Sequence, residues 1–253
     1  MMEWKNIKEQ LIVFLKDEVK KAGLERVTVG LSGGLDSAIV AILSKEAFGA
    51  NMSCVLMPSH YSSEGSISHA LEVCKKFDID HEIVEIAPMV EAYEKFMDGD
   101  KLRIGNFSAR MRMSVLYDVS ARDKSLVVGT SNKSEILLGY GTIYGDVACA
   151  INPIGEMYKS DEYEFGKFLG VPESILEKRP SADLWEGQSD EDELGYSYKQ
   201  MDEILKKLVD EKVSADDLKS NGVDKELIDM INYRMKANAF KGKLPTIAKI
   251  KWS

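Results

Sequence analysis

A glycine-rich octapeptide, Gly30-Leu31-Ser32-Gly33-Gly34-Leu35-Asp36-Ser37, gives the first indication of chemistry in this chain. It follows an apolar run typical of a strand and precedes an apolar run typical of a helix. Glycines let backbone N–H groups approach an anion closely, and a helix N-terminus adds partial positive charge. The pattern therefore predicts a phosphate-binding loop. It is not a Walker A loop, because no Lys follows the glycines. The alternative is that Asp36 and Ser37 only cap a helix.

A second polar segment, Gly129-Thr130-Ser131-Asn132-Lys133-Ser134-Glu135, follows another predicted strand. Strands that alternate with helices predict parallel βαβ units with right-handed crossovers. In such sheets ligands bind beyond the carboxyl ends of the strands. We therefore expect the two polar segments to open on the same edge of one sheet.

Hydrophobic periodicity predicts a doubly wound, mostly parallel α/β sheet flanked by helices, within a single domain over residues 1–253. Glycines at 139, 141 and 145 mark a loop without clear period, and residues 180–198 are polar and acidic, which is typical of a mobile lid or a linker. A C-terminal helical part is expected from about residue 198, followed by a basic tail over 241–253. The predicted strands are 26–31, 52–57, 81–86 and 124–129, and the predicted helices before the loop are 3–22, 38–48, 64–77, 88–97 and 106–122.

Composition argues against several classes of protein. The formal net charge of −9 argues against a general nucleic-acid binder. No apolar run approaches the ~18 residues that a membrane span needs, and no secretion signal is visible, so we expect a cytoplasmic protein that does not enter a membrane. The three cysteines form no C-x-x-C, and the three histidines fall on separate predicted elements, so a zinc site has little support.

Taken together, residues 32–37 and 129–135 resemble the motifs of the N-type ATP pyrophosphatases, and among them the chain is most similar to the ammonia-dependent NAD synthetases. The similarity extends over nearly the whole chain and implies an adenine nucleotide alpha hydrolase-like fold. Further matching motifs are Arg110 in Ser-Ala-Arg-Met-Arg, Tyr144-Gly145-Asp146, Asn152-Pro153, Lys159, and Pro180-Ser181-Ala182-Asp183-Leu184-Trp185.

The resemblance implies a two-step reaction that ends NAD biosynthesis. The carboxylate of nicotinic acid adenine dinucleotide (deamido-NAD) attacks the α-phosphorus of ATP, which gives an adenylate and pyrophosphate. Ammonia then attacks the activated carbonyl and releases NAD and AMP. Charge accumulates on the leaving pyrophosphate, so backbone N–H groups, cations and Mg²⁺ are expected around it. The family also implies a homodimer, with the dinucleotide near the interface; the apolar faces of helices 3–22 and 106–122 could serve there, or could pack on the chain's own sheet.

The resemblance also implies roles for individual residues. Residues 30–37 would surround the phosphates, Asp36 and Glu135 would hold Mg²⁺, and carboxylate oxygens suit that cation. Taken alone, Glu135 would be a solvated helix residue, and Lys159 and Arg110 would be surface groups. The ATP contacts are Thr130, Lys159 and Ser181; the catalytic residues are Asp36, Glu135 and Lys159; the substrate contacts are Arg110, Asp146 and Lys241. The chain departs from many relatives at Ile143, Ala150 and Phe240, where they carry Lys, Asp and His.

Two alternatives stay open at this point. Another ATP pyrophosphatase, such as GMP synthetase or a tRNA-thiolating enzyme, shares the phosphate loop. Thiolation generally needs cysteine or metal motifs that this chain lacks, and the absence of a glutaminase region points to free ammonia, although a separate amidotransferase partner would also fit. A nucleotide sensor without catalysis, like the universal stress proteins, shares the α/β layout but lacks Asp36-Ser37 and Glu135.

Overall fold

The computed structural model describes residues 2–183, 185, 187–243 and 245–251. In this part of the chain, four parallel strands form a sheet in the order β3-β2-β1-β4. Val29 of β1 lies between Cys54 of β2 and Val128 of β4. The strands are β1 (Arg26–Gly30), β2 (Met52–Leu56), β3 (His81–Ile83) and β4 (Ser125–Val128). The predicted parallel α/β sheet is confirmed.

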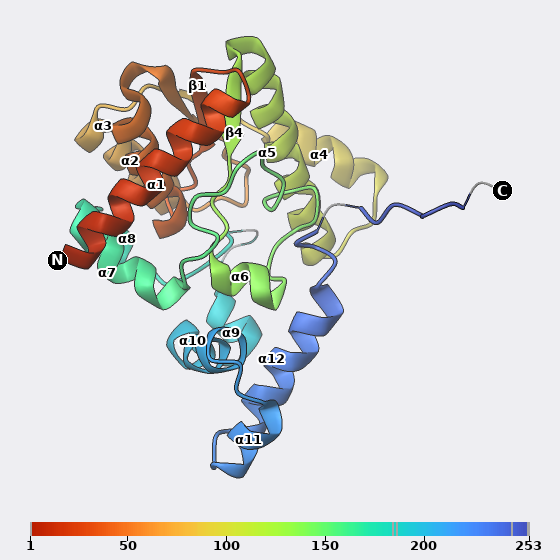
Figure 1. Cartoon of the computed structure of the whole chain (residues 1–253). Helices are drawn as coiled ribbons and strands as arrows, with labels where there is room; N and C mark the ends of the chain where they lie inside the picture. Colours follow the sequence, from red (N-terminus) through yellow and green to blue (C-terminus); the bar gives the residue numbers. More distant parts are fainter. Residues whose placement is uncertain (1, 184, 186, 244, 252–253) are drawn as a thin grey trace.

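Helices cover both faces of the sheet (Figure 1). On one face, Val27 and Val29 of β1 pack with Ile39 and other apolar residues of α2. On the other face, Val55 and Val127 pack with Leu116 of α5. This alternation follows from the period of two along a strand. The first layer contains α1 (Met2–Lys21), α2 (Leu35–Phe48), α3 (Glu64–Phe77), α7 (Lys159–Leu169) and α8 (Glu173–Leu176), and the second contains α4 (Ala87–Phe96) and α5 (Lys101–Asp123).

A separate apolar cluster holds the C-terminal part together, as Tyr198, Met201, Ile228 and Ile231 are all buried in it. Its helices lie below the sheet layers in Figure 1, and residues 245–251 extend away from the body. The predicted helical C-terminal part is thus confirmed. The remaining elements are α6 (Lys133–Leu138), α9 (Asp190–Leu194), α10 (Tyr198–Leu205), η2 (Lys206–Asp210), α11 (Ala215–Ser220), α12 (Lys225–Asn238) and the short η1 (Gly49–Asn51).

Some predicted boundaries were wrong. Helix α5 begins five residues before the predicted 106, because the Asp100 side chain accepts a hydrogen bond from the Arg103 amide at 2.8 Å and caps it. Strand β3 ends at Ile83, before the predicted residue 86. The predicted loop 180–198 contains the short helix α9. Leu184 and Glu186 of the predicted lid, and Leu244, Trp252 and Ser253 of the predicted tail, lie outside the described residues.

Two further expectations concern surfaces. Part of the apolar surface of α1 and α5, such as Leu15 and Leu116, is buried against the chain's own sheet, whereas Phe14 and Tyr117 are exposed, and the homodimer stays a prediction. Among the described residues, no helix combines the length and the apolar character that crossing a membrane would require.

Candidate active site

The glycine-rich loop follows β1, and hydrogen bonds of its own serines hold its conformation. Ser37 Oγ donates to the Gly34 carbonyl at 3.0 Å and accepts from the Ser32 amide at 3.2 Å. Gly33 has a φ of +79°, and a Cβ at this position would overlap the backbone carbonyl of Ser66. Glycine is therefore required there both by the left-handed backbone and by the close approach of α3. Because α2 begins at Leu35, its first N–H groups have no partner within the helix and can bind an anion.

A cavity of about 550 Å³ lies beyond the carboxyl ends of β1, β2 and β4. Nearly all residues that the sequence assigned to a site line this cavity. Among the described residues, the two predicted ones that do not line it are Gly33 and Arg110. The predicted residues that line it are Gly30, Leu31, Ser32, Gly34, Leu35, Asp36, Ser37, Thr130, Glu135, Asp146, Lys159, Ser181 and Lys241.

Asn132 joins the two polar segments at the sheet edge. Its side-chain amide donates to Asp36 Oδ1 at 2.7 Å. Its backbone amide donates to Glu135 Oε2 at 3.2 Å, and its Oδ1 accepts from the Glu135 amide at 2.9 Å, which completes a capping box on α6. Because β1 pairs directly with β4, both segments open on one edge, as expected. One residue thus fixes the positions of both predicted metal-binding carboxylates.

Lys159 is the first residue of α7 and is almost fully buried. Its ammonium forms an ion pair with the Asp36 carboxylate and lies 3.5 Å from Oε2 of Glu162. Burial alone would lower the pKa of Lys159, but Asp36 and then Glu162 outweigh it and raise that pKa well above its ordinary value. Burial would raise the pKa of Asp36, but Lys159, together with hydrogen bonds from Glu162 and Asn132, outweighs it and lowers that pKa. The site therefore holds an ionised Asp–Lys pair.

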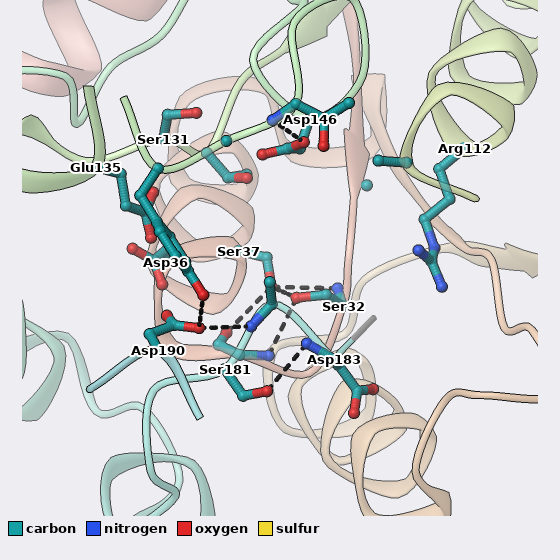
Figure 2. A pocket seen from close by; sticks show the side chains of 18 of the residues that line it. Ser32, Asp36, Ser37, Arg112, Ser131, Glu135, Asp146, Ser181, Asp183 and Asp190 are labelled. Carbon is teal, nitrogen blue, oxygen red and sulfur yellow. Dashed lines mark hydrogen bonds between the residues drawn. The ribbon is translucent and has the colours of Figure 1, made fainter. Parts of the chain in front are cut away.

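Three further carboxyl groups surround this pair. Burial and then Asp36 raise the pKa of Glu135 well above its ordinary value, and the same two causes raise that of Glu162. Burial raises the pKa of Asp190 on α9. Asp190 Oδ1 accepts hydrogen bonds from the Tyr140 hydroxyl at 3.1 Å and from the Ala182 amide at 3.0 Å. In Figure 2, Asp36, Glu135 and Asp190 lie together on one side of the cavity.

The segment after Pro180 lies beside the glycine-rich loop and is hydrogen-bonded to α3. Asp183 Oδ2 accepts from Ser66 Oγ at 2.8 Å and from the Ser63 amide at 3.3 Å. Ser181 Oγ accepts from the Asp183 amide at 3.0 Å, and this contact is drawn in Figure 2. The predicted ATP-contact residue Ser181 is thus held close to the glycine-rich loop.

The other end of the cavity is built from loops. The Thr142 amide donates to Asp146 Oδ1 at 2.8 Å. The Lys241 ammonium donates to the carbonyl of Gly139 at 2.8 Å and to that of Gly141 at 2.9 Å. Lys241 therefore holds the glycine loop that leads to Asp146.

Two arginines of α5, Arg110 and Arg112, face different surroundings. Arg112 lines the cavity, on the side away from Asp36 in Figure 2. Its Nε donates to the Met57 carbonyl at 3.0 Å and its Nη2 to Ser62 Oγ at 3.3 Å. The predicted substrate residue Arg110 is exposed, and its Nε donates to the Ile143 carbonyl at 3.3 Å. Within one chain, Arg112 and not Arg110 reaches the cavity.

Sequence reasoning missed four residues of this site: Arg112, Asn132, Glu162 and Asp190. Arg112 was noticed only as a neighbour of Arg110, two residues along the same helix. Glu162 lies one helical turn after Lys159, which is a spacing that could have indicated contact. Asp190 stood in a run of acidic residues that reads as a solvated loop, and no pattern in the sequence distinguishes it.

The sequence profile described as NAD synthase matches residues 7–245. This chain belongs to the NAD synthase family. A curated relative from Wolinella succinogenes, an NH(3)-dependent NAD(+) synthetase, is 50% identical over 243 residues, which are 96% of this chain and 95% of the relative. Another with the same name, from Campylobacter jejuni, is 48% identical over 252 residues, 98% of this chain and 100% of the relative. The resemblance stated from the motifs is confirmed.

Solved structures support the same assignment of fold. The NH3-dependent NAD synthetase of Campylobacter jejuni, in complex with the nitrate ion, matches with a TM-score of 0.83 and 42% identity, covering 97% of this chain and 99% of the other. A structure of NMN synthetase from Francisella tularensis matches with a TM-score of 0.87 and 32% identity, covering 98% and 99%. In this member of the NAD synthase family, the cavity thus lies where the shared fold would place a nucleotide, at the carboxyl ends of parallel strands.

Proposed function

We propose that this chain is a carbon–nitrogen ligase that amidates nicotinic acid adenine dinucleotide with ammonia at the expense of ATP. The substrate carboxylate attacks the α-phosphorus, pyrophosphate leaves, and ammonia replaces AMP on the carbonyl carbon. The observation that carries the proposal is the joining of the glycine-rich loop, Asp36, Glu135 and Lys159 at one sheet edge by Asn132. A cytoplasmic location is part of this proposal.

Different residues would bind the phosphates and the rest of the nucleotide. The loop and the first N–H groups of α2 would bind the β- and γ-phosphates, and stabilise charge that grows as pyrophosphate departs. Lys159 would supply a buried positive charge near the same phosphates. Thr130 and Ser181, which both line the cavity, would donate hydroxyl hydrogen bonds to the nucleotide.

The carboxylates also fit a magnesium ion bound together with the nucleotide. Among the described residues, no group of three His, Cys, Asp or Glu side chains could hold a metal by itself. Mg²⁺ in nucleotide enzymes commonly uses one or two carboxylates and completes its six oxygens with phosphates and water. Asp36 and Glu135 would hold the ion, which when bound neutralises phosphate charge.

Fewer contacts support the assignment of residues that would bind the dinucleotide substrate. Asp146 and Lys241 would lie at the nicotinate end, and Arg112 lines the cavity between them and the loop after β2. Arg110 would contact substrate only from outside the cavity of one chain. The homodimer that the resemblance implies would provide such a surface, and both roles stay predictions.

One incubation tests the proposal. The protein is mixed with ATP, Mg²⁺, ammonium and nicotinic acid adenine dinucleotide, and NAD and AMP are measured by chromatography. We expect both products in equal amounts. Formation of ADP and phosphate, or activity that appears only with an added nucleic acid, would contradict the proposal. ATP binding without release of pyrophosphate would favour the sensor alternative.

A second candidate substrate is the mononucleotide. The match to the NMN synthetase of Francisella tularensis has a TM-score of 0.87, against 0.83 for the NAD synthetase of Campylobacter jejuni. The same amidation chemistry applied to nicotinic acid mononucleotide would give NMN. Adding both acids to one incubation and comparing kcat/KM decides between them, since the discrimination between competing substrates equals that ratio.

A further inference from the structure

Glu162 of α7 has an environment that the proposed reaction does not explain. Its side chain is completely buried, and neither carboxyl oxygen accepts a hydrogen bond from the described residues. Its charged neighbours are the Lys159 ammonium, 3.5 Å from Oε2, and the Asp36 carboxylate. A buried carboxyl group with so few partners destabilises a fold, and apolar residues are often as good or better in such places. Glu162 is therefore expected to contribute to something other than stability.

The ammonium of Lys159 is shared between two carboxyl groups. It forms an ion pair with Asp36 and lies beside Glu162. Asp36 is also the residue proposed to bind the divalent cation. When the cation occupies Asp36, Lys159 loses that partner, and an ammonium left unpaired in a buried site is costly.

We propose that Glu162 is a positioning residue that holds the Lys159 ammonium when Asp36 binds the cation. Glu162 follows Lys159 by three residues on the same helix, so the two side chains lie on one helical face in every state of the site. The ion pair shifts from Asp36 to Glu162, and Lys159 stays within reach of the phosphates. The inference depends on the proposed function in one respect, namely that Asp36 binds the cation.

Replacement of Glu162 by Met removes the carboxyl oxygens that lie beside the Lys159 ammonium. The cation must then compete with Lys159 for Asp36, and its binding leaves the ammonium without a partner. We expect the affinity for the cation to fall by roughly tenfold or more, as is typical when a group that supports metal ligands is removed. Glu162→Gln keeps one acceptor oxygen, so its loss should be smaller. The melting temperature of either variant should equal or exceed that of the unchanged protein, since Lys159 retains Asp36.

The test measures binding of α,β-methylene-ATP by calorimetry, with and without Mn²⁺. This analogue cannot form the adenylate, so the readout is independent of activity. We expect Glu162→Met to reduce the gain in affinity that Mn²⁺ provides, and to leave binding of the metal-free analogue unchanged. The matched control is Glu164→Met on the same helix, because Glu164 is exposed and pairs with Lys167 at 2.8 Å. This control should behave like the unchanged protein.

The outcomes are distinguishable. If Glu162→Met retains the full gain from Mn²⁺, the inference is overturned, and the same holds for Glu162→Gln if only that variant folds. If neither variant folds, Glu162 is required for folding and the inference is also overturned. Asp36→Asn tests the function on which the inference rests: if this variant retains the full gain from Mn²⁺, the cation site itself is wrongly assigned.

Discussion

The proposed phosphate end and the proposed nicotinate end of the cavity are built in different ways. At the phosphate end, the functional groups stand directly after β1 and β4 or on the first turns of α2, α6 and α7. Hydrogen bonds such as that from Asn132 to Asp36 link segments distant in the chain. At the nicotinate end, Asp146 and Gly141 stand in an irregular loop, and Lys241 reaches them from beyond the last helix.

The pairing of strands positions the residues of the first end, whereas the conformation of a loop positions those of the second. The register of β1 against β4 fixes the two polar segments as neighbours before any side chain is considered. No comparable regular element fixes where residues 139–146 lie relative to α5 and α12. Substitutions at the phosphate end should therefore abolish chemistry, and those at the nicotinate end should weaken substrate binding.

The largest effect is expected at Asp36. Asp36→Ala removes a carboxylate that pairs with Lys159 and accepts from Asn132. We expect the rate of adenylate formation to fall by roughly 10³-fold, the upper range for a group that stabilises transition-state charge. Pyrophosphate exchange into ATP, in the presence of nicotinic acid adenine dinucleotide, measures this step. Glu135→Ala should act in the same way.

Asp118→Ala is the control for these variants, since Asp118 is an exposed acid on α5. All three proteins should keep the circular dichroism spectrum of the parent. Full exchange activity in Asp36→Ala or Glu135→Ala would remove that residue from the proposed metal site.

The next largest effect distinguishes two arginines of one helix. Arg112→Ala removes the guanidinium that holds the Met57 carbonyl and Ser62 on the cavity wall. We expect kcat/KM for the dinucleotide to fall by about 10²-fold, because displaced positioning groups have effects of that size. Arg110→Ala is the matched comparison. A loss as large as that of Arg112→Ala would show that Arg110 contacts the substrate from a surface outside this cavity.

Much of the fold could be predicted because local signals and tertiary structure agree. Gly23 and Gly49 follow α1 and α2 in conformations with positive φ, next to the helix ends predicted at residues 22 and 48. The start of α5 was missed because Asp98-Gly99-Asp100 is equally typical of a break between elements. Asp100 is in fact the N-cap, and the apolar period before residue 106 is weak.

For the site, prediction succeeded where motifs follow strands and was incomplete elsewhere. The strand–loop–helix pattern indicated residues 30–37, and the family resemblance added Thr130 and Glu135. The structure brings them together around one cavity, apart from Gly33, which is not among the residues that line it. Asp190 and Arg112 depend on how a long loop and a long helix are oriented in space. No period or spacing in the sequence encodes that orientation.

A smaller effect is expected at Lys241, which would show whether the nicotinate end depends on loop positioning. Lys241→Met removes two hydrogen bonds to the carbonyls of Gly139 and Gly141. A hydrogen bond from a charged donor stabilises the loop that it holds by about 1.5–3 kcal/mol. We therefore expect KM for the dinucleotide to rise about tenfold, with KM for ATP unchanged. Lys243→Met, at an exposed position nearby, should have no effect. An equal rise in both KM values would contradict a separate role for the nicotinate end.

The smallest effect concerns the segment over residues 183–198, which joins the two ends. Asp183→Ala removes the acceptor that fastens this segment to Ser63 and Ser66. One such contact contributes on the order of 1 kcal/mol, so cleavage within the segment by a glutamate-specific protease should become about fivefold faster. Saturating ATP and dinucleotide should slow cleavage of the parent if the segment closes over ligands. Asp192→Ala, which removes only the exposed pair with Arg179, is the control. Equal cleavage with and without substrates would mean that this segment is a fixed wall of the cavity. Residues 139–146 would then be the part of the cavity wall that remains to be tested for movement.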